Sequence, residues 1–137
     1  MIVPSSGFLR EVERLFSVSY PAPFRQFCER FARENILDAY PDITRGQFIT
    51  DLETLKAVNS RIGFEQWSDL ERAVAGKVHP KDGMRLWGEI LPVNFDADFV
   101  YGYYYSEPEN SSVYVWSVHC IVHAYPDLEN WLEAVGR

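Results

Sequence analysis

Apolar residues recur at helical spacing in the first part of the chain. The first stripe predicts a helix that is capped by Ser5 or Ser6 and ends at about Phe16. Residues 20–23 then form a stiff connector, because each proline fixes its own φ and disfavours helix at the preceding residue. A second helix is expected beyond the connector. Its apolar stripe is Phe24, Phe27, Cys28 and Phe31.

The middle of the chain has a weaker pattern. Residues 43–49 favour a short strand, and Thr50 is placed to cap a third helix with Glu53 in a capping box. The inner face of that helix would carry Leu52, Leu55 and Val58. Further helical turns are expected around Trp67, Leu70 and Val74, ending near Gly76, and residues 79–83 favour a turn.

From Met84 onward the pattern changes to short runs of aromatic and β-branched residues, which are typical of antiparallel strands. The runs cover residues 86–93, 99–105, 113–118 and 120–125, and the polar segment 107–112 predicts a hairpin loop. Beyond Pro126, an apolar stripe that includes Trp131 predicts a short closing helix. The sequence therefore predicts one α+β domain over residues 1–137. Its antiparallel sheet lies in the C-terminal half and packs with the N-terminal helices and the closing C-terminal helix.

The composition favours one compact domain and limits the classes of partner that it can bind. A chain of 137 residues with 47% apolar content can close a single core. Its 13 Lys and Arg residues against 20 Asp and Glu residues give a net charge of −7, which disfavours direct contact with nucleic acid or anionic lipid and favours a basic partner. No signal-peptide pattern and no long apolar run occurs, so we expect a cytoplasmic protein without a membrane segment. Oligomeric state is not predicted.

Three residues that commonly bind zinc, His119, Cys120 and His123, lie close together in the sequence. In a strand the two histidines would stand roughly 13 Å apart and Cys120 would point to the other face. We therefore expect no metal site. Cys28 could meet a histidine across the fold, but its place in an apolar stripe favours a buried core thiol.

Paired carboxylates are the other candidate for chemistry. Asp96 and Asp98 resemble a metal-holding pair, although aspartates at this spacing are common in turns. The chain has no glycine-rich phosphate loop, nucleophile elbow or zinc-protease motif. We expect no enzyme activity and no cofactor, and keep as an alternative a small enzyme that uses Asp96, Asp98 or His119.

The run 99–105 is aromatic or apolar on both faces of a strand, with odd-numbered side chains on one face and even-numbered ones on the other. One face must meet the core, while exposed tyrosines suit a protein interface. Carboxylates in the flanking segments would attract arginine and lysine, or would simply keep the turns solvated. The candidate partner-binding residues are Glu89, Asp96, Asp98, Tyr101, Tyr103, Tyr105, Glu107 and Glu109.

The order of these elements resembles the SUKH superfamily, small α+β proteins many of whose bacterial members are immunity proteins against polymorphic toxins. The resemblance spans most of the chain. It runs from the amphipathic first helix through the proline connector and aromatic helix (Tyr20–Phe31) to segments 91–102 and 113–116. It closes on the acidic, aromatic segment Tyr125–Leu132.

The resemblance implies a non-enzymatic inhibitor that binds a cognate protein toxin, often a nuclease, and blocks its active site or its access to substrate. Because the chain is acidic, we expect this toxin to be basic. Immunity surfaces vary with their toxins, so no individual binding residue is carried over from the family. A scaffold or regulatory module of the same fold, which binds an endogenous protein, is the alternative.

Overall fold

The computed structural model describes residues 3–34, 46–66, 86, 89–107, 109–117 and 120–135. They form a five-stranded antiparallel sheet in the order β1-β2-β3-β4-β5, with helices packed around it. The α+β class, the sheet in the C-terminal half and the closing helix are confirmed. The helices are α1 (Ser6–Phe16), α2 (Ala22–Glu34), α3 (Leu52–Gln66) and α5 (Leu128–Val135). The strands are β1 (Gln47–Phe48), β2 (Ile90–Phe95), β3 (Val100–Tyr104), β4 (Val113–Ser117) and β5 (Cys120–Tyr125).

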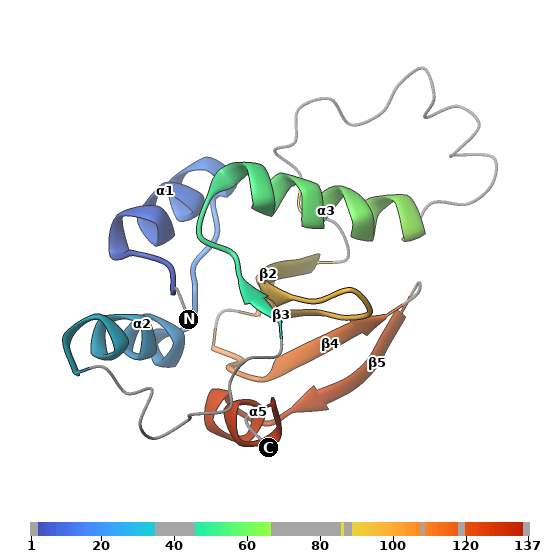
Figure 1. Ribbon diagram of the computed structural model, residues 1–137. Helices are drawn as coiled ribbons and strands as arrows, with labels where there is room; N and C mark the ends of the chain where they lie inside the picture. Colours follow the sequence, from blue (N-terminus) through green and yellow to red (C-terminus); the bar gives the residue numbers. More distant parts are fainter. Residues whose placement is uncertain are drawn as a thin grey trace.

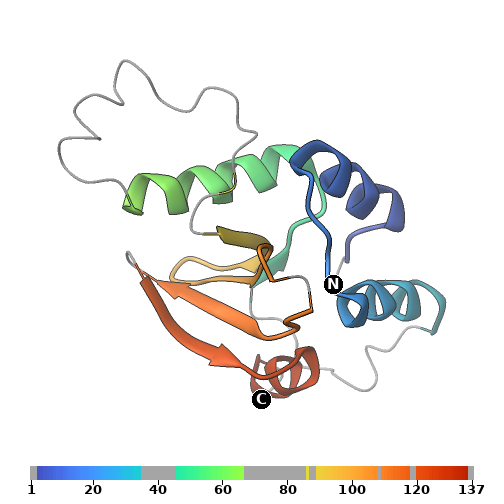
Figure 2. The same cartoon turned by 180° about the vertical axis from the view of Figure 1, so that it is seen from behind.

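The helices surround the sheet on several sides. Figure 1 shows α1 and α2 together at one end of the sheet, α3 running beside β2, and α5 near β5 and the C-terminus. The view from behind in Figure 2 gives the same arrangement. A single apolar cluster joins all these elements, so the helices and the sheet share one core.

The first two helices are tied together by a carboxylate. Helix α1 begins as predicted, since Ser5 Oγ accepts a hydrogen bond from the Phe8 N–H at 3.2 Å. The Glu13 carboxylate accepts from the Tyr20 N–H at 2.9 Å and pairs with Arg25 of α2. Helix α2 begins at Ala22, earlier than expected, because a proline is tolerated in the first turn of a helix.

The third helix is capped by a neighbour of the predicted residue. Asp51, not Thr50, provides the cap: its Oδ1 accepts from the Thr54 N–H at 2.8 Å and its Oδ2 from the Thr54 hydroxyl at 3.0 Å. Strand β1 covers only residues 47–48 of the predicted 43–49, of which 43–45 lie outside the described residues. The helical turns expected at 67–76 and the turn at 79–83 also lie outside them.

The sheet brings the aromatic strand β3 against β2 and the helices. Gly102 lies opposite Pro92, and a Cβ on Gly102 would stand 2.6 Å from the Leu91 carbonyl oxygen, so glycine permits the close approach of the two strands. Strand β2 begins at Ile90 rather than residue 86, and its register shifts at Val93. Residues 90–94 are all buried, so both faces of β2 are covered.

Candidate functional site

Two of the tyrosines expected at a partner surface are core residues instead. Tyr101 is 8% and Tyr103 1% exposed. The Tyr103 ring packs against Phe24 of α2 at 5.8 Å, and the Tyr101 ring against Trp131 of α5 at 5.4 Å, between ring centroids. The odd-numbered face of β3 therefore packs against α2 and α5. A partner cannot reach Tyr103 without unfolding that layer.

Asp96 and Asp98 form the turn between β2 and β3. Asp96 Oδ1 accepts from the backbone N–H of Asp98 at 2.8 Å and of Phe99 at 2.7 Å, which is the geometry of a side-chain-capped turn. Arg61 of α3 donates to the backbone oxygen of Asp96 at 3.0 Å. The Asp96 side chain thus has a structural role, whereas that of Asp98 is exposed.

The remaining candidates lie at the other end of the sheet. Glu89 precedes β2, while Glu107 and Glu109 follow β3, and all three are exposed. Asp96 and Asp98 connect the opposite ends of these two strands. A strand as long as β2 spans about 20 Å, so the predicted acidic residues do not form one patch.

A tyrosine pair marks the Glu89 end. The rings of Tyr104 on β3 and Tyr114 on β4 have centroids 4.1 Å apart and planes inclined by 42°. The Asn110 amide donates to the Tyr114 hydroxyl at 2.8 Å and to Glu107 Oε2 at 3.0 Å. Both tyrosines are half-buried, so their outer ring surface is open to a partner. We call Tyr104, Tyr114, Glu89, Glu107 and Asn110 the Tyr104 surface.

Carboxylates make the Tyr104 surface electronegative. Burial raises the pKa of Tyr104, and the charges of Tyr114, Glu89 and Glu107 raise it further, so its phenol stays neutral well into the alkaline range. Glu89 Oε2 accepts from the Ser106 hydroxyl at 3.2 Å. The ring faces of two tyrosines beside two carboxylates favour a Lys or Arg side chain, by cation–π contact and by charge.

Glu89 has a strained backbone. Its φ is 57°, a left-handed conformation that residues with a Cβ seldom adopt. The strain is held by Tyr105, whose N–H donates to the Glu89 carbonyl at 3.1 Å and whose hydroxyl lies 3.4 Å from the Leu86 carbonyl oxygen. Tyr105 therefore contacts Leu86 and Glu89 rather than presenting its hydroxyl to a partner. Strained residues tend to lie at functional sites.

Sequence reasoning missed Tyr104, Tyr114 and Asn110 as members of the site. The alternation in β3 separated Tyr104 from Tyr101 and Tyr103, and deciding which face was buried would have identified it. Tyr114 becomes its neighbour only through the β3–β4 register, in which Gly102 pairs with Tyr114. Glu89 and Glu107 are the predicted residues that the fold brings together around this pair.

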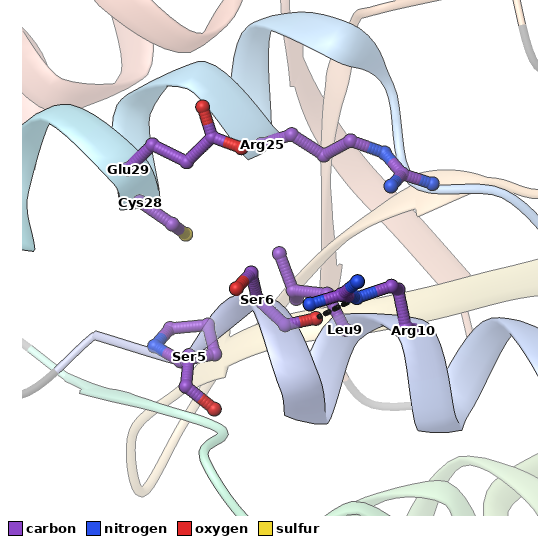
Figure 3. A pocket seen from close by; sticks show the side chains of 8 residues that line it. Ser5, Ser6, Leu9, Arg10, Arg25, Cys28 and Glu29 are labelled. Atoms are coloured by element: carbon purple, nitrogen blue, oxygen red, sulfur yellow. Dashed lines mark hydrogen bonds between the residues drawn. The ribbon is translucent and has the colours of Figure 1, made fainter.

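A cavity of about 630 Å³ lies between α1 and α2. Figure 3 shows Arg10 and Arg25 on two sides of it and the Cys28 sulfur turned toward it. Both arginines are already engaged, since Arg25 pairs with Glu13 and Arg10 Nε donates to the Ser6 carbonyl at 3.3 Å. Burial, followed by the charge of Glu29, raises the pKa of Cys28 to about 12, so this thiol is protonated as expected of a core residue.

His119, Cys120 and His123 were considered as metal ligands, and no metal site was expected. Within it, no group of three or more His, Cys, Asp or Glu side chains is arranged to hold an ion. Cys120 is exposed on β5, the His123 ring contacts Tyr125 at 4.6 Å between centroids, and His119 lies outside the described residues. None of the helices described is both long enough and apolar enough to cross a membrane.

Comparison of the chain with models of protein families, with curated proteins and with solved structures gives no match. The resemblance to the SUKH superfamily consequently remains a prediction.

Proposed function

We propose that this chain is a cytoplasmic, non-catalytic immunity protein that binds and neutralises a cognate bacterial toxin, a basic protein such as a nuclease. The observation that carries the proposal is the Tyr104 surface, in which two phenol rings in contact stand beside exposed carboxylates. Such a surface matches the lysine- and arginine-rich face with which a nuclease meets its nucleic acid. Occupying that face would deny the toxin its substrate.

The two kinds of side chain contribute differently to binding. The net charge of −7 steers a basic protein toward this chain and accelerates its capture, an effect that salt weakens. The tyrosines supply large, stiff ring surfaces that lose little conformational entropy when they are covered, and so prolong the life of the complex. Asn110 holds both the Tyr114 hydroxyl and the Glu107 carboxylate, which preorganises the surface.

Affinity capture from the native cells tests the proposal. The tagged chain is washed at low and then at high salt, and the retained protein is expressed alone and together with the chain. We expect one basic protein, retained in roughly equal amount and less firmly at high salt, that arrests growth alone and is harmless in co-expression. Retention of harmless housekeeping proteins would contradict the proposal and favour a scaffold or regulatory module.

A further inference from the structure

Carboxylates lie on two sides of the ring at the centre of the Tyr104 surface. Glu89 lies on the β2 side, because the next residue, Ile90, pairs with Tyr104. Glu107 lies where the chain leaves β3, and its N–H donates to the Tyr104 carbonyl at 3.3 Å. Burial is the main cause of the raised pKa of Tyr104, and the charges of Tyr114 and of both carboxylates add to it. Both carboxylates are therefore within electrostatic reach of a cation placed on this ring.

Among the described residues, each of these carboxylates is held through one of its two oxygens. Glu89 Oε2 accepts from the Ser106 hydroxyl at 3.2 Å, and Glu107 Oε2 accepts from the Asn110 amide at 3.0 Å. The Asn110 amide is itself fixed, because its Oδ1 accepts from the Ser112 N–H at 3.0 Å. A carboxylate can accept about four hydrogen bonds. Both side chains are thus oriented by neighbours and keep acceptor capacity for the donors of a partner.

An arginine uses these features more fully than a lysine. The guanidinium group is planar, so it can lie on a tyrosine ring and still donate from its edges to carboxylates. The lysine ammonium is a compact and strongly hydrated charge, which loses more hydration when it is placed on a ring. Exposed ion pairs contribute little to affinity. The contact with the ring therefore decides which of the two cations is preferred.

We propose that the partner places an arginine, rather than a lysine, on the Tyr104 surface, with the guanidinium on the Tyr104 ring and its edges bonded to Glu89 and Glu107. The inference rests on the proposed function for the basic character of the partner, and it names the side chain that anchors the complex. Tyr104 then determines specificity, and the two carboxylates determine how strongly any cation binds. Ser106 and Asn110 are positioning residues, because they act through the carboxylates that they hold.

The probes are three short peptides, Gly-Ser-Xaa-Ser-Gly with both ends blocked, in which Xaa is arginine, lysine or citrulline. Citrulline has the planar shape of arginine without its charge. Each peptide is titrated into the full isotope-labelled chain, and the chemical shifts of the backbone amides report the affinity and the place of binding. We expect the arginine peptide to bind about threefold more tightly than the lysine peptide and about tenfold more tightly than the citrulline peptide. The amides of Tyr104, Glu107 and Tyr114 should shift most.

Matched variants separate the contribution of the ring from that of the charge. Tyr104→Phe keeps an aromatic ring and should keep the preference for arginine over lysine. Tyr104→Leu keeps an apolar side chain without a ring, so it should bind the two peptides about equally. Glu107→Gln should weaken both peptides about twofold and leave their ratio unchanged. The measured quantity is a ratio within each chain, so a general loss of stability cannot produce the expected pattern, and circular dichroism verifies folding.

Equal affinity of the original chain for the arginine and lysine peptides would overturn the inference. A preference for arginine that survives in Tyr104→Leu would do so too, as would the absence of shift changes around Tyr104 at the highest soluble concentration of the arginine peptide. Each of these results leaves the proposed function standing, because a toxin can be captured through other residues. Capture of harmless proteins alone would instead remove the proposed function and leave the measured arginine preference intact.

Discussion

The ring of Tyr104 leans onto the ring of Tyr114 across two neighbouring strands, with 4.1 Å between the centroids. The two residues are diagonal neighbours, because the residue directly opposite Tyr114 is Gly102. The space that a Gly102 side chain would take is filled by β2, since a Cβ there would stand 2.6 Å from the Leu91 carbonyl oxygen and 2.7 Å from Ile90 Cγ2. The two tyrosines therefore meet across the strands beside a position that has no side chain of its own.

Replacing Glu89 with glycine should raise the stability of the protein and lower its affinity for the partner. The left-handed φ of 57° costs a residue with a Cβ about 1–2 kcal/mol, which glycine avoids, although the more flexible unfolded chain offsets part of the gain. We expect the free energy of unfolding of Glu89→Gly to rise by about 1 kcal/mol in urea denaturation, and its affinity for the partner to fall. Loss of stability would contradict the strain argument.

Glu89→Gln serves as the control for this variant. It keeps the side chain and the backbone strain but removes the charge. We expect unchanged stability and reduced affinity, so the two variants together assign the affinity loss to the carboxylate. Equal affinity of Glu89→Gln and the original chain would exclude Glu89 from the partner contact.

Tyr103→Phe should stabilise the protein, most strongly at high pH. The Tyr103 hydroxyl is buried and finds no hydrogen-bond partner among the described residues, so removing it should raise the free energy of unfolding by about 1 kcal/mol at pH 7. Burial, followed by the charge of Cys28, raises the Tyr103 pKa far above its usual 10.0.

The direction of that shift fixes the pH dependence. A group whose pKa is higher in the folded protein than in the unfolded chain stabilises the fold at pH values below its pKa in the unfolded chain. This stabilisation is lost as the pH rises above that value. The original chain should therefore lose stability above about pH 10, and Tyr103→Phe should lose less of it. Parallel pH profiles for the two chains, measured by urea denaturation, would contradict the burial of this hydroxyl.

The two cysteines should differ in reactivity. Cys120 is exposed, whereas Cys28 is 3% exposed and has a pKa raised to about 12 by burial and the charge of Glu29. At pH 8, iodoacetamide should modify Cys120 alone in the folded protein and both cysteines in urea. Mass spectrometry of the peptides reports each site. Rapid folded-state modification of Cys28 would contradict its burial.

Trp131 should be essential for docking of the closing helix. Its indole is 0% exposed and contacts Phe48 of β1 at 5.8 Å and Tyr101 of β3 at 5.4 Å between ring centroids. Trp131→Ala should lower the free energy of unfolding by about 3–5 kcal/mol. Trp131→Phe keeps an aromatic ring and should cost less. A similar loss in both variants, measured by urea denaturation, would argue against specific ring packing.

The periodic patterns predicted the helices and strands well. The exact residues at which they begin and end were harder to predict, because neighbouring residues have similar preferences. Phe24, Phe27 and Cys28 face the core as their helical spacing indicates. Adjacent Thr50 and Asp51 are both good caps, and only the path of the chain leaving β1 decides between them. Strand β2 shifted because apolar residues extend past its ends, so pairing with β3, rather than composition, sets its bounds.

The site was harder to predict than the fold. Alternation divided the tyrosines of β3 into two faces but could not show that the face of Tyr103 meets α2. Asp96 and Glu107 seemed to belong together because they are near in sequence, yet a strand separates them. Tyr114 joins the site only through the register of β3 and β4. The left-handed φ at Glu89 could not be predicted, because the sequence has no glycine at that position to indicate it.

The most direct test of the central claim compares the affinities of matched variants for the captured toxin. Tyr104→Ala and Glu107→Lys change the Tyr104 surface, and Glu11→Lys makes the same charge change at an exposed position on α1. Isothermal titration calorimetry measures each Kd. We predict a loss of about 2 kcal/mol, roughly 30-fold, for each surface variant and little change for Glu11→Lys. Equal affinities for all chains, with folding intact, would contradict the account.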